Sequence, residues 1–183
     1  MKKISFSIFV FFSIILFCSL GTWQLYRLQW KLNLINEINN GLNSEPIFYS
    51  KSYIKNYQKV KFSGIFDFKK QIYLYSLNKN GTPGYDIITP IKTKSNEILL
   101  VNRGWIKKDL KNNKDIDKIE TQSFEGVIKK ITKPNPFKPE NDIKNNEWYS
   151  LKIHDLENFT GYELNNYTLI LQNNYNPLVE IKI

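Results

Sequence analysis

Cysteine, histidine and arginine are scarce in this chain of 183 residues. Cys18 is the single cysteine, so no intramolecular disulfide can form. His154 is the single histidine, and this count excludes metal sites built from clusters of Cys and His. Hydrolysis with a histidine base would rest on His154 alone, and no nucleophile motif lies near it. We therefore predict no metal site and no catalytic residues, and we interpret the chain as a binding protein rather than an enzyme.

A nucleic-acid-binding module is also missing, although the formal net charge is +9. The lysines are scattered among abundant Asn and Ile, a composition that follows when nucleotide bias favours A and T. Aromatic residues make up 15% of the chain, which is too many for a disordered tail. We expect no nucleic-acid partner, and we expect the positive charge to favour anionic lipid headgroups.

One long hydrophobic run is present, and it covers residues 4–20 without a charge or a proline. Extended to Trp23 it reaches about 20 residues, the length that a helix needs to cross a hydrocarbon core of about 30 Å. We therefore predict a transmembrane anchor at residues 1–23. Beyond it, aromatic side chains suited to the membrane interface alternate with basic ones that can reach lipid phosphates: Trp23, Tyr26, Arg27, Trp30 and Lys31.

A cleaved signal peptide is the competing interpretation of the same run. Cleavage requires small residues before the cut, and residues 17–20 read Phe-Cys-Ser-Leu. An uncleaved, single-pass anchor is therefore expected. Lys2 and Lys3 favour a cytoplasmic N-terminus, which would leave the rest of the chain outside the cytoplasm.

The pattern after the anchor predicts an amphipathic helix over residues 24–41 and a linker over 42–57. Leu25, Leu28, Leu32 and Ile35 follow helical spacing, and Gly41 is suited to end the helix. Such a stripe packs on the chain's own domain, or docks at the membrane or on a partner.

Residues 58–172 predict a mainly β fold, closed as an antiparallel barrel or folded as a sandwich, and followed by a tail over 173–183. Pro90 suggests an edge or a bulge in its strand, and Gly161 ends a helical turn that begins at Asp155. The expected strands cover residues 58–66, 71–77, 85–93, 97–106, 121–131, 147–153 and 167–171.

Several motifs together resemble the SURF1 family of cytochrome c oxidase assembly proteins. At the foot of the anchor stands Gly-Thr-Trp-Gln-Leu-Tyr-Arg-Leu over residues 21–28. In the β domain stand Gly-Tyr-Asp-Ile-Ile-Thr-Pro over 84–90 and Val-Asn-Arg-Gly-Trp over 101–105. A weaker match ends in Asn-Glu-Trp-Tyr over 146–149. Order and spacing hold from about residue 20 to residue 149.

This resemblance implies a protein of the bacterial inner membrane with a β-rich periplasmic domain. The family helps to mature the haem a and copper centre of oxidase subunit I, and bacterial members are thought to bind or hand over haem a. The expected partners are therefore membrane lipid and oxidase subunit I or its assembly intermediates. Family members usually end in a second membrane helix, preceded by a histidine that serves as haem ligand. Residues 173–183 contain neither, so either the gene is truncated or this member works with one anchor.

The candidate binding residues come from the two strongest motifs. On the helix they are Trp23, Gln24 and Arg27, where interfacial anchoring competes with docking on an oxidase subunit. In the β domain, Arg103 would pair with a haem propionate or a partner's carboxylate, or else bind loop carbonyls at a strand end. Its neighbours complete the candidate set: Asn102, Gly104 and Trp105.

The sequence therefore predicts a membrane-anchored assembly factor that assists haem a insertion into subunit I. The alternatives are a tethered adaptor without a cofactor and a degenerate, truncated family member.

Overall fold

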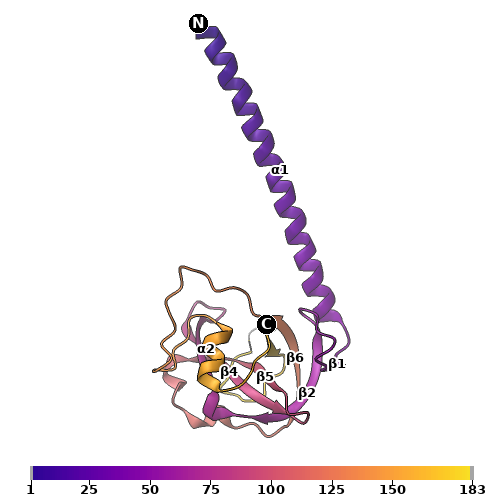
Figure 1. Ribbon diagram of the computed structural model, residues 1–183, viewed down its shortest axis with the longest axis vertical. Coiled ribbons are helices and arrows are strands. Elements are labelled where there is room, and N and C mark those ends of the chain that lie inside the picture. Colours follow the sequence, from indigo (N-terminus) through magenta and orange to yellow (C-terminus); the bar gives the residue numbers. More distant parts are fainter. Residues whose placement is uncertain (1, 182–183) are drawn as a thin grey trace. The chain divides into compact units, whose positions relative to one another are not determined.

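The computed structural model describes residues 2–181, with one unit ending at Asn43 and a second beginning at Ser44 (Figure 1). The first unit is a single helix, α1 (Lys2–Asn43), of 42 residues. At 1.5 Å per residue it is about 63 Å long, roughly twice the thickness of a hydrocarbon core. Among the described residues it is the one helix long and apolar enough to cross a membrane, which is compatible with a single-pass anchor.

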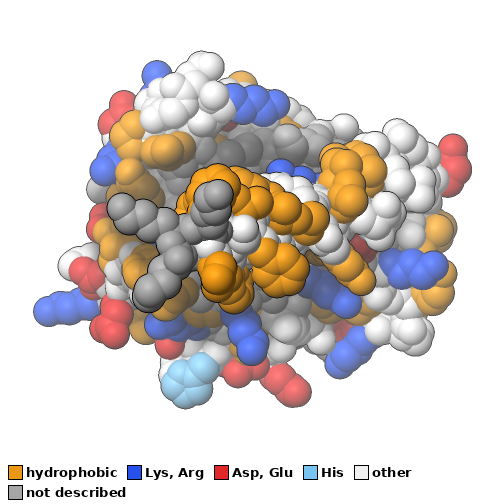
Figure 2. All heavy atoms as spheres, turned by 90° about the horizontal axis from the view of Figure 1, so that it is seen from above, with side chains coloured by type: hydrophobic (Ala, Val, Ile, Leu, Met, Phe, Trp, Pro, Cys, Tyr) orange, Lys and Arg blue, Asp and Glu red, His pale blue; other side chains and the backbone are white. Residues whose placement is uncertain are grey.

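The apolar part of α1 satisfies its own polar groups. The hydroxyls of Ser13, Ser19 and Thr22 each donate to a backbone carbonyl three or four residues earlier, at 2.9 Å. In a lipid environment no water would take that role, so these bonds suit a membrane-spanning helix. Figure 2 shows hydrophobic side chains over much of the visible surface of the helix. The helix passes through Gly41, the residue predicted to end it, and stops at Asn43.

Within residues 2–181 the second unit forms a seven-stranded sheet in the order β1-β2-β6-β7-β5-β4-β3. An additional pairing of β2 with the end of β4 closes strands β2, β6, β7, β5 and β4 into a barrel. The predicted mainly β fold is confirmed in its barrel form. The sheet is mixed rather than antiparallel throughout, because β1 pairs with β2 and β5 with β7 in parallel. The strands are β1 (Ile47–Phe48), β2 (Lys59–Phe66), β3 (Ile72–Leu77), β4 (Pro83–Thr93), β5 (Ile98–Lys107), β6 (Ser123–Lys130) and β7 (Tyr167–Leu171).

Pro90 lies where β4 changes its neighbour. On one side β4 pairs with β3 as far as Ile88, and from Ile91 it pairs with β2. The carbonyl of Pro90 accepts from the N–H of Asp67 at 2.9 Å, on this same side. Since the N–H and C=O of a strand residue point to one side, the missing N–H of proline falls in the gap between β3 and β2. The proline therefore removes no bond to β5.

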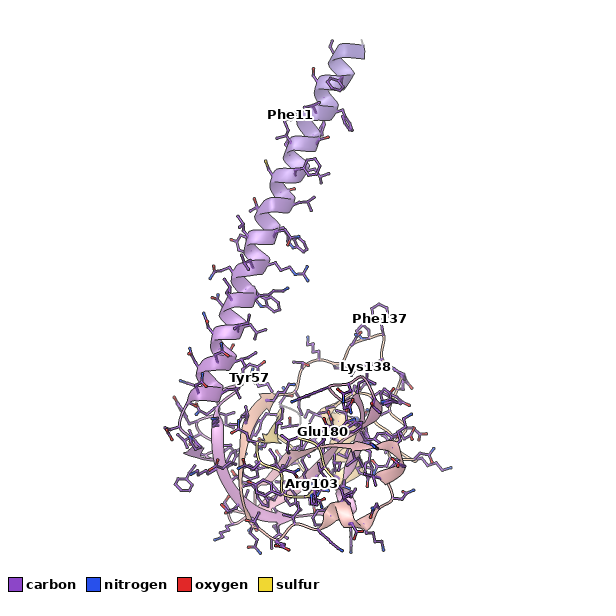
Figure 3. The ribbon with its side chains drawn as sticks, turned by 180° about the vertical axis from the view of Figure 1, so that it is seen from behind. Phe11, Tyr57, Arg103, Phe137, Lys138 and Glu180 are labelled. Atoms are coloured by element: carbon purple, nitrogen blue, oxygen red, sulfur yellow. The ribbon has the colours of Figure 1, made fainter. Side chains whose placement is uncertain are left out.

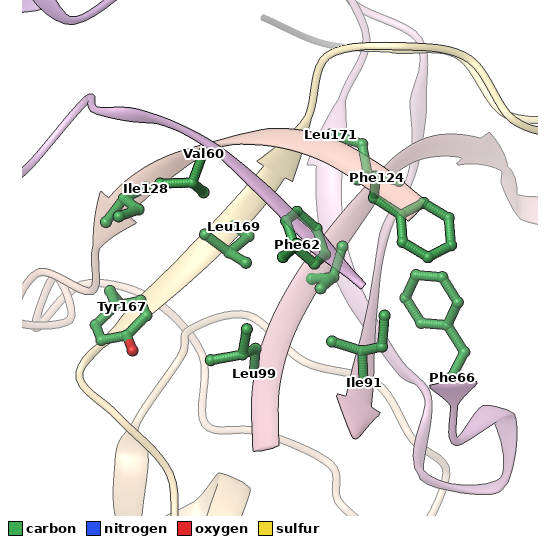
Figure 4. Packing of buried hydrophobic residues seen from close by; sticks show 11 residues of the cluster. Val60, Phe62, Phe66, Ile91, Leu99, Phe124, Ile128, Tyr167, Leu169 and Leu171 are labelled. Carbon is green, nitrogen blue, oxygen red and sulfur yellow. The ribbon is translucent and has the colours of Figure 1, made fainter. Parts of the chain in front are cut away.

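The barrel interior is filled by side chains that alternate along the strands (Figure 4). Along β2, Val60, Phe62, Gly64 and Phe66 are buried, while the alternate residues reach the surface. The rings of Phe62 and Phe66 pack on Phe124 of β6, with centroids 5.7 and 5.0 Å apart. Leu99 and the β7 residue Leu169 complete this layer. The period of two thus places the apolar side chains in one core.

A second core lies under α2 (Ile153–Thr160), where a strand was predicted over residues 147–153. That prediction is wrong: Trp148 and Glu147 form only isolated bridges, with Leu74 and Asp142 respectively. Trp148 is fully buried with Ile72 and Leu156, so its apolar character reflects packing of a loop rather than a strand. Gly161 ends α2 in the left-handed conformation, as predicted.

Short elements connect the strands and cover the barrel. Residues 42–57 contain β1, and in the segment 173–183 Val179 is buried and Glu180 pairs with Trp105. The backbone bonds of that pair measure 2.7 and 2.8 Å. Three single 3₁₀ turns complete the unit: η1 (Phe68–Lys70), η2 (Lys108–Leu110) and η3 (Lys114–Asp117).

Gly64 is required where β2 crosses β4, and we expect Gly64→Ala to destabilise the barrel. A Cβ there would lie 2.3 Å from the carbonyl oxygen of Lys92 and 3.0 Å from Ile91 Cγ1, so the backbone of β4 would have to move. The expected loss is about 2–3 kcal/mol in the free energy of unfolding. Denaturant unfolding of the full chain in detergent, followed by tryptophan fluorescence, measures it. Gly21→Ala is the matched control, because nothing lies within 4 Å of its added Cβ; equal behaviour of the two variants would contradict the prediction.

Candidate functional site

Arg103 occupies a β-bulge in the middle of the barrel wall. In the pairing of β4 with β5, Ile87 stands opposite Gly104 and Ile88 stands opposite Asn102. Arg103 is therefore the extra residue of β5, and Gly104 takes a positive φ of 122°. A bulge re-aims the side chain at its extra residue. Here it buries the guanidinium, which is only 3% exposed (Figure 3).

The guanidinium joins four parts of the chain by hydrogen bonds. Nε donates to Thr89 Oγ1 of β4 at 3.0 Å, and Nη1 donates to the carbonyl of Ile116 in η3 at 2.8 Å. Nη2 donates to Asp117 Oδ1 at 3.0 Å and also to Gln71 Oε1, just before β3. Gln71 and Thr89 are buried as well, and the Thr89 hydroxyl donates to the same Gln71 oxygen. The three nitrogens of Arg103 thus all have partners inside the domain.

Two aromatic rings and one carboxylate keep Arg103 charged in this buried place. Burial lowers the pKa of Arg103, and the Asp117 carboxylate opposes that shift. Its guanidinium carbon lies 5.1 Å from the ring centre of Phe68 and 5.8 Å from that of Phe66. The carboxylate that Arg103 pairs with is therefore Asp117 of its own chain. This geometry favours the structural interpretation of Arg103 over binding of an external carboxylate.

The neighbours of Arg103 shape the bulge and hold the C-terminal segment. Asn102 Oδ1 accepts from the N–H of Gly104 at 2.9 Å. A Cβ on Gly104 would lie 2.6 Å from the carbonyl oxygen of Glu180, so the glycine permits the close approach of that segment. Trp105 is buried, and its indole donates to the carbonyl of Ser76 at 3.3 Å. Residues 102–105 thus form the bulge together and hold the segment around Glu180 against β5.

The helical candidates belong to α1 and are all exposed. The guanidinium carbon of Arg27 lies 5.4 Å from the ring centre of Trp23, one helical turn away. Gln24 adjoins this pair, and Leu25, Leu28 and further apolar residues to Ile35 are exposed as well. An exposed aromatic–cation pair beside exposed leucines is typical of a membrane interface or a docking surface.

A cluster of tyrosines and lysines beside β3 was missed by sequence reasoning. Lys111 Nζ lies 5.2 Å from the Tyr85 ring centre and 5.6 Å from that of Tyr73, and it pairs with Glu147 at 3.4 Å. The Tyr85 hydroxyl donates to the same carboxylate at 3.0 Å. The alternation of Tyr73 and Tyr75 in β3 was visible in the sequence. Their position beside Tyr85 depends on the register of β3 against β4, and the position of Glu147 depends on the loop before α2. The spacing of residues in the sequence predicts neither.

The described residues do not fit a haem held by an axial ligand. The side chain of His154, the single histidine of the sequence, is 86% exposed on α2 and contacts the Asn158 amide at 3.2 Å. Arg103, the candidate for a propionate, is buried with its donors engaged. Residues 2–181 also contain no group of three His, Cys, Asp or Glu that could hold a metal ion.

Comparison with known proteins gives a consistent result. The sequence model of the SURF1 family matches residues 11–182. The chain is 34% identical over 179 residues to the SURF1-like protein of Rickettsia conorii, covering 93% of this chain and 72% of that relative. It is also similar to Surfeit locus protein 1 of Gallus gallus, at 34% over 170 residues, and of Homo sapiens, at 28% over 167 residues. It covers 55% and 56% of those two proteins, or little more than half of their length.

The buried position of Arg103 predicts a large loss of stability for Arg103→Met. The substitution leaves the Asp117 carboxylate and the Ile116 carbonyl without the donor that Arg103 supplies, at a cost of about 3 kcal/mol or more in the free energy of unfolding. Lys61→Ala is the control, because it breaks an exposed ion pair with Glu125 and should change stability by about 0.5 kcal/mol or less. Denaturant unfolding of both variants checks this. Similar losses for the two would show that Arg103 does not hold the domain together.

The raised pKa of Tyr85 leads us to expect a loss of folding stability at high pH. Burial and the hydrogen bond to Glu147 raise its pKa to about 12, above the value of about 10 for a free tyrosine. Because the folded state holds this proton more tightly, its stabilising effect is complete below pH 10 and disappears as the pH rises through 12. Tyr85→Phe should therefore flatten the fall in unfolding free energy between about pH 10 and 12. Unfolding curves of both proteins across this range test it, and parallel curves would contradict the assignment.

Proposed function

The chain belongs to the SURF1 family, and from this membership we propose that it is a membrane-anchored assembly factor for cytochrome c oxidase. The family match over residues 11–182 is the single observation that carries the proposal. The stage at which the chain acts, on this proposal, is the insertion of haem a into subunit I. Its partners are then subunit I or assembly intermediates that contain it.

The two units suggest a division of work. The apolar half of α1 anchors the chain in the bacterial inner membrane, with the N-terminus in the cytoplasm and the β unit in the periplasm. The half that follows carries exposed apolar side chains and the Trp23–Arg27 pair, which suit contact with lipid or with helices of a membrane subunit. The barrel then acts as a rigid body fixed to a membrane complex.

Binding, rather than chemistry on a substrate, is the mechanism that fits these residues. Arg103 is engaged within the fold, and His154 is an exposed side chain on α2 beside Asn158 and Asp155. An assembly factor needs only to hold an intermediate open or protected, and this requires a stable surface but no reactive group. We therefore propose that the chain steadies subunit I during haem insertion without itself supplying a haem ligand.

The deciding experiment is deletion of the gene, followed by difference spectra of haem a and oxidase activity in the membranes. We expect assembled oxidase to fall and to return with the intact gene. A variant with Trp23→Ala and Arg27→Ala should restore less oxidase at equal protein level, because the docking pair is gone while the barrel is untouched. Ile65→Ser is the matched control, since it removes an exposed apolar side chain of the barrel instead.

The outcomes separate the candidate functions. Unchanged oxidase in the deletion strain would refute the assembly role and favour the adaptor without a cofactor. Full restoration by the double variant would contradict docking through the Trp23–Arg27 pair of α1, and it would leave the assembly role itself unaffected. Arg103→Ala should lower the amount of protein itself, as a structural residue does; normal protein with lost oxidase would instead assign Arg103 a direct role.

A further inference from the structure

The loop between β6 and the Asp142–Glu147 bridge presents one aromatic side chain to the solvent. Phe137 is 93% exposed, and Figure 3 shows it at the tip of the loop, pointing away from the barrel. It is more exposed than every other large hydrophobic side chain among the described residues. Transfer of this ring from water into an apolar environment would be favourable.

The loop is built to hold this tip in place. At its end the Asn141 side chain accepts from the N–H groups of Tyr149 and Ser150, at 2.9 and 3.1 Å, and donates to Asp155 at 3.0 Å. At the tip, Asn135 Oδ1 accepts from the N–H of Phe137 at 2.9 Å. Three prolines restrict the backbone of the loop: Pro134, Pro136 and Pro139. A pre-organised loop loses little conformational entropy when its tip is bound.

Lysines surround the base of the same loop. A cavity of about 360 Å³ is lined by Lys129, Lys130, Lys133 and Lys138, together with neutral polar residues, apolar residues and one acidic residue, Asp86. Among residues 2–181, none of these four lysines has a carboxylate within ion-pair distance. Lys138 donates to the carbonyl of Tyr149 at 2.9 Å. The loop thus has an apolar side chain at its tip and positively charged lysines near its foot. This combination is typical of peripheral contact with anionic lipid.

We propose that the Phe137 loop is a second membrane contact, in which Phe137 enters the interface and the lysines face anionic headgroups. The bilayer is favoured over a protein groove for two reasons. The chain carries a helix long enough to span a bilayer. A lone aromatic ring, among lysines that form no ion pair with the described carboxylates, lacks the broad apolar face that a protein partner would cover. This contact is independent of the oxidase role.

Fluorescence of the full chain in proteoliposomes tests the contact. Cys18→Ser removes the single native thiol, and Phe137→Cys then takes a nitrobenzoxadiazole label whose emission depends on polarity. Vesicles contain phosphatidylcholine alone or mixed with phosphatidylglycerol, with doxyl-labelled lipid as quencher. We expect a blue-shifted, quenched label in the anionic vesicles and a weaker effect in the neutral ones.

Two matched variants sharpen the result. The label at Ile65→Cys, on an exposed apolar position of β2, should stay in water in both vesicles. Lys130→Gln with Lys133→Gln should weaken the contact of the Phe137→Cys label about 30-fold in the anionic vesicles, since each lysine near such a surface contributes about fivefold to binding.

Three results would overturn the proposal. Absence of quenching at position 137 in both vesicles would place the loop in water. Equal quenching with neutral and anionic lipid, or in the lysine variant, would exclude the headgroup contact. Shielding of the label only in native membranes, with none in vesicles, would identify a protein partner as the occupant of this loop.

Discussion

A permanently charged guanidinium lies inside this β domain, and the wall of the barrel is arranged around it. An isolated charge could not be buried there, so the chain supplies a carboxylate, a side-chain amide, a hydroxyl, a carbonyl and two aromatic rings. These groups come from β2, η1, β4, η3 and the residue before β3. Because one side chain ties elements that are distant in sequence, the bulge at Arg103 fixes the register of β5 against β4 and the position of η3 together.

The bulge also controls the neighbouring segment. The positive φ of Gly104 follows directly after the extra residue, and it is the absence of a Cβ there that admits the carbonyl of Glu180. Trp105 can then pair its backbone with Glu180 while its indole reaches Ser76. The Val-Asn-Arg-Gly-Trp motif over residues 101–105 thus stabilises the fold. Arg103 is the bulge residue and the buried cation, Gly104 permits the close approach of Glu180, and Trp105 packs in the core.

Local patterns in the sequence predicted much of this fold. The alternation of Val60 and Phe62 identified β2, and the uninterrupted apolar run identified α1. The failures depend on distant contacts. Trp148 and its neighbours resembled a strand because a buried loop needs the same apolar residues. The closure of β2 on β4 and the parallel pairing of β5 with β7 bring together segments that no local pattern relates. For the site, the motif located Arg103, but its partners Asp117 and Gln71 could not be inferred, since polar residues near a turn usually face water.

Trp148 protects an edge of the sheet from pairing with other molecules. A closed barrel still leaves β1 and β3 at the ends of the sheet, and exposed strand edges invite pairing between molecules. β1 has only two residues, too few to recruit another strand. On β3, the N–H of Trp148 donates to the carbonyl of Tyr73 and its carbonyl accepts from the N–H of Tyr75, at 3.0 and 2.7 Å. A single loop residue therefore occupies the middle of this edge, so self-association by strand addition would first have to extract a buried indole.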